Sequence, residues 1–134
     1  MFVKFTFTNA QIDKYLQAAK RDLEIARKSE LSEVAFRFCY DAVIKLAIAI
    51  CAAYGLRVKS RRGHHAALIA KLAEYLSDDN IKNVADNMRM KRNHDLYDGG
   101  RIFSRKETAE HMKWAENIFI KAGKHLKIKL NKLL

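Results

Sequence analysis

The amino-acid sequence predicts an all-α protein, an antiparallel bundle of four to five helices with a short extended arm at its N-terminus. Apolar residues recur at helical spacing through almost the whole chain after Thr8. The chain contains no proline, which long helices joined by few sharp turns can do without. Its commonest residue types, which include Ala, Leu, Ile and Lys, suit helix interiors.

The first eight residues have a different pattern. Val3, Phe5 and Phe7 alternate with polar residues, which indicates an extended segment. A single strand needs a partner. The segment therefore either lies as an arm on the helices or pairs at an edge in a dimer, and we favour the arm.

The first two helices are delimited by capping residues. Thr8 or Asn9 caps a helix that runs to about Lys28. Ser29 or Ser32 starts the second helix, and Gly55 suits the left-handed position that ends it. The predicted core residues are Ile12, Leu16, Ala19, Leu23 and Ala26 in the first helix, and Val34, Phe38, Ala42, Leu46, Ala49 and Ala53 in the second.

A basic loop, residues 57–62, leads into a third helix that spans about residues 64–76. After a turn at residues 77–80, the fourth helix runs to about Tyr97, where two glycines stop it. Ser104 and Glu107 form a capping box for the fifth helix. These elements fill one domain, residues 1–134, which is large enough to bury a core.

The N-terminus has no signal-peptide pattern, and the longest apolar run, residues 46–54, is too short to cross a membrane. Cys39 and Cys51 lie about 18 Å apart if one helix carries both, so no disulfide can join them. We therefore expect reduced thiols in a cytoplasmic protein with no membrane association. The five histidines have no metal-binding spacing. No glycine-rich phosphate loop or nucleophile elbow is present either, so we expect no metal and no cofactor.

The chain is strongly basic, because its 26 Lys and Arg residues outnumber 15 Asp and Glu and give a net charge of +11. This charge favours a polyanionic partner, chiefly nucleic acid or an acidic protein. The plain alternative is a soluble surface whose charges repel other copies of the protein.

Arg92 occupies an unexpected position. On a helical wheel it shares one stripe with Ile81, Ala85 and Met88, where an apolar residue is expected. An arginine at such a position needs a carboxylate, a partner chain or an anionic ligand. One interpretation is an internal clamp to Asp95 or Asp41, and the other is a phosphate-binding arginine in a cleft or at a dimer seam.

Other charged residues and histidines are also candidates for a functional role. Arg37, Asp41 and Lys45 are spaced four apart, which predicts a solvated salt-bridge ladder. The same face is suited to completing a pocket around Arg92. His94 is the candidate acid or base nearest to Arg92 in sequence, but it lies about 200° around the helix, which favours a surface role. The pair at residues 64–65 is expected to start the third helix.

The end of the fourth helix resembles a known motif. Arg92–Asn93, followed by Tyr97 and Asp98, is similar to the signature of HEPN domains (higher eukaryotes and prokaryotes nucleotide-binding). In that family an arginine and a polar residue precede a histidine by four to six positions. A branch of small prokaryotic members carries a tyrosine–aspartate form instead, which this sequence matches. The aromatic start of the second helix at residues 36–42, the loop at residues 55–64 and the start of the last helix at residues 104–109 also resemble the family.

The resemblance implies a homodimeric helical bundle, and many members are metal-independent ribonucleases, including toxins of toxin–antitoxin pairs and defence effectors. It implies that Arg92 holds the scissile phosphate and that Asn93 assists. Tyr97 stands where an active member has histidine. A tyrosine is a poor base at neutral pH, so activity would depend on His94 or on a second subunit. Asp95, Asp41 and Arg37 are candidate supporting residues.

The basic residues that would contact RNA are Arg57, Lys59, Arg61, Arg62 and Arg89. The alternative function is that of a non-catalytic HEPN dimer. Such a dimer would bind a nucleotide or a partner protein, such as a minimal nucleotidyltransferase or a cognate antitoxin.

Overall fold

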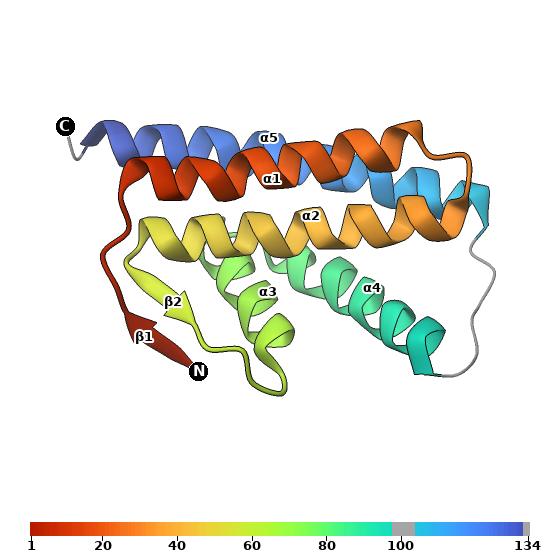
Figure 1. The fold of residues 1–134 in the computed structure, drawn as a ribbon, viewed down its shortest axis with the longest axis horizontal. Coiled ribbons are helices and arrows are strands. Elements are labelled where there is room, and N and C mark those ends of the chain that lie inside the picture. The colour runs from red at the N-terminus through yellow and green to blue at the C-terminus, as the bar shows by residue number, and fades with distance from the viewer. Residues whose placement is uncertain (98–103, 133–134) are drawn as a thin grey trace.

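The computed structural model describes the backbone of residues 1–97 and 104–132, and the side chains of these residues except 95–97, 128 and 130–132. Within this described part of the chain five helices dominate the fold, as the sequence predicts (Figure 1). They are α1 (Asn9–Lys28), α2 (Ser32–Ala53), α3 (His64–Tyr75), α4 (Asp79–Tyr97) and α5 (Arg105–Lys132). Two short strands, β1 (Phe2–Lys4) and β2 (Leu56–Val58), complete the fold.

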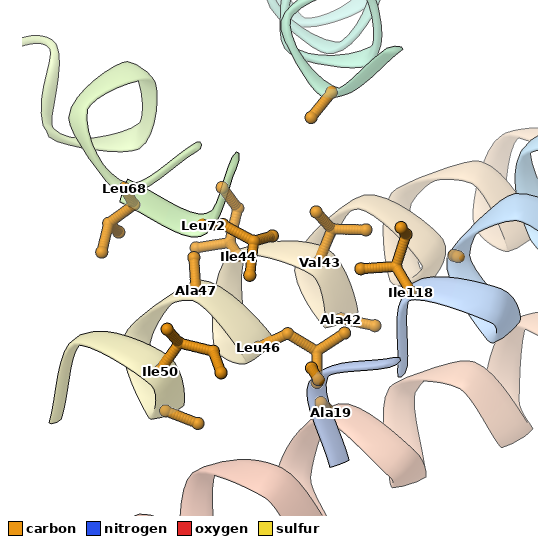
Figure 2. Packing of buried hydrophobic residues seen from close by; sticks show 14 of the residues in the cluster. Ala19, Ala42, Val43, Ile44, Leu46, Ala47, Ile50, Leu68, Leu72 and Ile118 are labelled. Carbon is orange, nitrogen blue, oxygen red and sulfur yellow. The ribbon is translucent and has the colours of Figure 1, made fainter. Parts of the chain in front are cut away.

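Helix α2 is the centre of the bundle. It packs against all four other helices, with α1 and α5 on one side and α3 and α4 on the other (Figure 1). Apart from a polar stripe that includes Arg37, Asp41 and Lys45, α2 is apolar over most of its surface, and such a surface is buried against other helices. Figure 2 shows its side chains meeting Ala19 of α1, Leu68 and Leu72 of α3, and Ile118 of α5. The buried residues of α2 are Ala35, Phe36, Cys39, Tyr40, Ala42, Val43, Ile44, Leu46, Ala47, Ala49, Ile50, Cys51 and Ala52.

The extended N-terminal segment pairs within the chain. Strand β1 is antiparallel to β2, with Val3 opposite Arg57. The sequence-based assignment of residues 57–62 to a loop is therefore wrong at its start, because Arg57 and Val58 belong to a strand. Gly55, with a φ of 73°, turns the chain after α2, and its carbonyl accepts a hydrogen bond from the Phe5 amide at 2.9 Å. This turn brings β2 beside β1 and supplies the partner that a lone strand requires.

The helix starts show how local residues delimit the bundle. Thr8 and Gln11 form a reciprocal capping box before α1, although the sequence pointed to this motif only before α5. The Glu107 amide donates to Ser104 Oγ at 3.0 Å, as predicted for the start of α5. Helix α2 begins at Ser32 rather than at Ser29, and no side chain caps it. Among the described residues, no helix has the length and apolar character needed to span a membrane.

Candidate functional site

Arg92 lies where the buried stripe of α4 reaches the surface. Ile81, Ala85 and Met88 are fully buried on this stripe, and the next residue on it, Arg92, is half-buried. The Arg92 guanidinium carbon is 5.8 Å from the centre of the Tyr40 ring of α2. The aromatic face of Tyr40 thus occupies the side of Arg92 that an apolar neighbour would otherwise fill.

No described carboxylate forms a salt bridge with Arg92. Its one hydrogen bond to a described side chain is a long contact of 3.5 Å with Asn93, the next residue. Asp41 interacts with Arg92 only at longer range. Burial and the nearby Asp22 raise the pKa of Asp41, and the charges of Lys45 and Arg92 partly oppose this rise. The predicted clamp from Arg92 to Asp41 is therefore wrong. The side chain of Asp95, the other predicted clamp partner, lies outside the described residues.

The predicted ladder along α2 is also not formed. Lys45 Nζ lies 2.6 Å from Asp22 Oδ2 of α1, rather than beside Asp41. Asp22 is only 3% exposed, so the ammonium compensates a buried carboxylate. Arg37 is exposed and forms no salt bridge with the described residues. The ladder prediction failed because sequence spacing considers one helix alone, whereas α1 supplies the closer acid.

Beside Arg92, a tyrosine and a histidine from two helices share a hydrogen bond. Tyr40 is 0% exposed, and its hydroxyl lies 2.9 Å from His65 Nδ1 of α3. Burial raises the pKa of Tyr40 to about 12, although Arg92 and Arg89 oppose this effect. Burial, together with the charges of His64, Arg92 and Arg89, lowers the pKa of His65 to about 4. Both groups are consequently neutral at pH 7.

Helix α3 directs its N-terminus into the same region. It begins at His64, as the sequence predicts, after Gly63, which has a φ of 83° and no side chain to cap the helix. The N-terminus of a helix carries a partial positive charge. The rings of His64 and His65 are 4.4 Å apart, and His64 Nδ1 lies 2.8 Å from the carbonyl oxygen of Arg61. The region around the arginines of α4 therefore also contains two imidazoles and the N-terminus of α3.

Sequence reasoning missed Tyr40 and His65 as site residues. The pattern identified residue 40 as part of an aromatic motif and residue 65 as a helix start, with no sign that the two meet. The usable signal was a pair of histidines directly after a basic loop, which places imidazoles at a positively charged helix terminus.

The remaining predicted residues are spread around this cluster. Arg89 is half-buried and forms a salt bridge of 3.4 Å with Asp86, one turn earlier. His94 is exposed, and the side chain of Tyr97 lies outside the described residues. Arg57 stacks over the Phe5 ring, with its guanidinium carbon 5.4 Å from the ring centre. Lys59, Arg61 and Arg62 are exposed.

Within the described part of the chain, no group of three or more His, Cys, Asp or Glu side chains is arranged to hold a metal ion. The described cluster instead combines cations, neutral imidazoles and a buried phenol. This combination suits an oxyanion that arrives with its own negative charge, because guanidinium groups and helix termini bind phosphate oxygens.

Comparisons with protein-family models, with curated proteins and with solved structures found no match to this chain.

Proposed function

We propose that this protein binds RNA through Arg92 and cleaves it as a metal-independent ribonuclease. The observation that carries the proposal is the environment of Arg92. Its guanidinium is half-buried against Tyr40, and no described carboxylate neutralises it within salt-bridge distance. A guanidinium in this setting has donors to spare for the oxygens of a phosphate.

The charges around Arg92 support a polyanionic ligand. Arg89 and the N-terminus of α3 lie near the Tyr40–His65 pair, and the exposed basic residues of the preceding loop lead up to that terminus. Electrostatic attraction to such a region grows with each phosphate that a ligand carries. RNA satisfies this requirement better than a single nucleotide does, and the net charge of +11 adds a long-range attraction.

The reaction type rests on the resemblance of Arg92–Asn93 and Tyr97–Asp98 to the HEPN motif. On that basis the protein belongs in the cytoplasm, as a toxin or a defence component that cuts RNA. Two chains would form a homodimer, in which each Arg92 faces polar groups of the other chain across a shared cleft. Light scattering at micromolar concentration tests this assembly, and a purely monomeric protein would contradict it.

The decisive experiment compares Arg92→Ala with Arg21→Ala, which removes an exposed arginine from α1. Binding and cleavage of a fluorescent RNA are measured in the presence of EDTA. Loss of a charge-assisted contact of about 1.5–3 kcal/mol should weaken binding by the Arg92 variant roughly 10- to 100-fold. Cleavage should fall at least as far, and Arg21→Ala should behave like the wild type.

Arg92→Lys should also fail, because an ammonium cannot grip two phosphate oxygens in the planar geometry of a guanidinium. Thermal melts accompany each assay. Since Arg92 has no described salt-bridge partner, its removal should leave the melting temperature nearly unchanged. Equal RNA binding by wild type and Arg92→Ala would reject the proposal.

A second candidate function is a non-catalytic dimer that binds a nucleotide or a partner protein, such as a minimal nucleotidyltransferase or an antitoxin. Tyr97 at the histidine position favours it, because tyrosine is a weak base at neutral pH. RNA that is bound by the wild-type protein but stays intact in EDTA and in Mg²⁺ would favour this candidate over the ribonuclease.

A further inference from the structure

The hydrogen bonds at the start of α3 assign the proton of His64. Its Nδ1 lies 2.8 Å from the carbonyl oxygen of Arg61. A carbonyl oxygen only accepts hydrogen bonds, so Nδ1 must carry the hydrogen. In the neutral imidazole the other nitrogen, Nε2, then has a lone pair that is free to accept a proton.

His65 has the opposite arrangement. The Tyr40 hydroxyl is buried, and its one partner among the described residues is His65 Nδ1 at 2.9 Å. If Nδ1 donated, the Tyr40 hydroxyl hydrogen would be buried without an acceptor, which costs free energy. Tyr40 therefore donates to Nδ1, and the hydrogen of His65 lies on Nε2.

The Nε2 atoms of His64 and His65 are both accessible from the surface. Among the described side chains, the single buried nitrogen or oxygen without a hydrogen-bond partner is His111 Nδ1. Neither Nε2 atom is therefore sealed inside the protein. The two rings are 4.4 Å apart, so an acceptor and a donor stand side by side. His65 bonds the Tyr40 hydroxyl, and the Arg92 guanidinium carbon lies 5.8 Å from the centre of the Tyr40 ring, so this pair lies near the proposed phosphate site.

We propose that His64 is the general base of the ribonuclease and that His65 donates a hydrogen bond to the phosphate that Arg92 holds. This inference rests on the proposed function. It supplies the proton acceptor that Tyr97 provides poorly, from a helix that the HEPN-like motif does not include.

The reaction is a transesterification. His64 Nε2 takes the proton of the ribose 2′-hydroxyl, and the 2′-oxygen forms a bond to phosphorus. The bond between phosphorus and the 5′-oxygen breaks, and the leaving oxygen takes a proton back from the His64 imidazolium. His65 Nε2–H and Arg92 stabilise the charge that develops on the non-bridging oxygens. The products are a 2′,3′-cyclic phosphate and a 5′-hydroxyl end, with no oxidant or other co-reactant.

Tyr40 is a positioning residue in this scheme, because it acts on the phosphate only through His65. Tyr40→Phe removes the donor that holds the hydrogen of His65 on Nε2. Nitrogen-15 spectra of the histidines report the tautomers directly, whether or not RNA is present. The wild-type protein should show Nδ1–H for His64 and Nε2–H for His65, and Tyr40→Phe should shift His65 toward a mixture. The reverse assignment in the wild type would overturn the inference.

Activity tests use His64→Ala, with His125→Ala as the matched control, since His125 bonds Tyr54 at the C-terminal end of α2. His64→Ala should bind RNA as the wild type does but cleave it roughly 100- to 10,000-fold more slowly, the usual contribution of a general base. Added imidazole should restore part of its rate, and His125→Ala should keep the full rate.

The outcomes separate the two proposals. If the wild type cleaves and Arg92→Ala does not, but His64→Ala retains the full rate, the His64 assignment is wrong and the proposed function stands. If His64→Ala is slow and imidazole restores no activity, the general-base role is also rejected. If the wild type leaves RNA intact, the ribonuclease itself is rejected, and the roles of His64 and His65 fall with it.

Discussion

The titration of His65 is governed by its surroundings. Its pKa is about 4 in the folded protein, because burial and the charges of His64, Arg92 and Arg89 disfavour the imidazolium. In the unfolded chain an imidazole titrates near its ordinary pKa of about 6.5. Between these values the unfolded chain binds more protons than the folded protein. The free energy of unfolding should therefore rise as the pH increases from about 4 to about 6.5.

This dependence can be assigned to His65 by comparing urea unfolding of the wild type and His65→Gln at several pH values. Since His65 is partly exposed, its share is about 1–2 kcal/mol after discounting for solvent. In the variant, the rise in the free energy of unfolding between about pH 4 and pH 6.5 should be smaller by that amount. The depressed pKa values of His111 and His125 contribute in the same direction and remain in both proteins. Identical slopes for the two proteins would contradict the prediction.

The two cysteines provide a second test at the scale of single residues. Burial raises the pKa of Cys39 and of Cys51 to about 12, and neither is in a disulfide. A thiol reagent attacks the thiolate, so the native protein at pH 8 should react very slowly. Both thiols should react at once in denaturant. Rapid labelling of either one under native conditions would show that the core opens locally.

At the scale of elements, one ion pair joins α1 to the central helix α2. The carboxylate of Asp22 is buried, and Lys45 reaches it from a partly exposed position on α2. The ion pairs Arg27–Glu116 and Lys71–Glu74 are more exposed. Exposed pairs of this kind contribute little stability, so the Asp22–Lys45 pair is the polar contact whose loss should matter most between these helices.

Lys45→Ala should destabilise the protein by about 1–3 kcal/mol, because it leaves the buried Asp22 carboxylate without its counter-ion. Lys14→Ala, which removes an exposed lysine from α1, should change the free energy of unfolding by less than about 0.5 kcal/mol. The double variant Asp22→Ala, Lys45→Ala should cost less than the sum of the two single changes. Additive costs would mean that the two side chains do not interact.

At the scale of the whole molecule, the net charge of +11 should dominate the strength and speed of the proposed RNA association. Each neutralised phosphate of a single strand contributes about 0.7 to the slope of log K against log salt. The RNA affinity of the wild type should therefore fall steeply and linearly on such a plot. Arg92→Ala should reduce the slope by about 0.7, which corresponds to one lost phosphate contact. RNA binding that does not depend on salt would contradict an electrostatic interface.

Several features of the fold follow from the sequence alone. Thr8, Gly55 and Ser104 delimit helices through backbone and capping preferences that act over three or four residues. The spacing of apolar residues along each helix predicts the buried face, as Ile81, Ala85 and Met88 illustrate. Short-range chemistry of this kind is written in neighbouring residues, which is why the helices and the unusual position of Arg92 were predictable.

Only the tertiary structure decided which polar groups meet. Tyr40 and His65 are 25 residues apart, and Lys45 lies 23 residues from Asp22. The contact between Tyr40 and His65 needs α3 to fold back against α2. The contact between Lys45 and Asp22 needs α1 to lie antiparallel to α2 (Figure 1). Helical spacing compares residues one or two turns apart on the same helix, so it proposed partners within α2 and α4. The packing of apolar faces sets how helices are rotated against one another, and that rotation selects the polar neighbours.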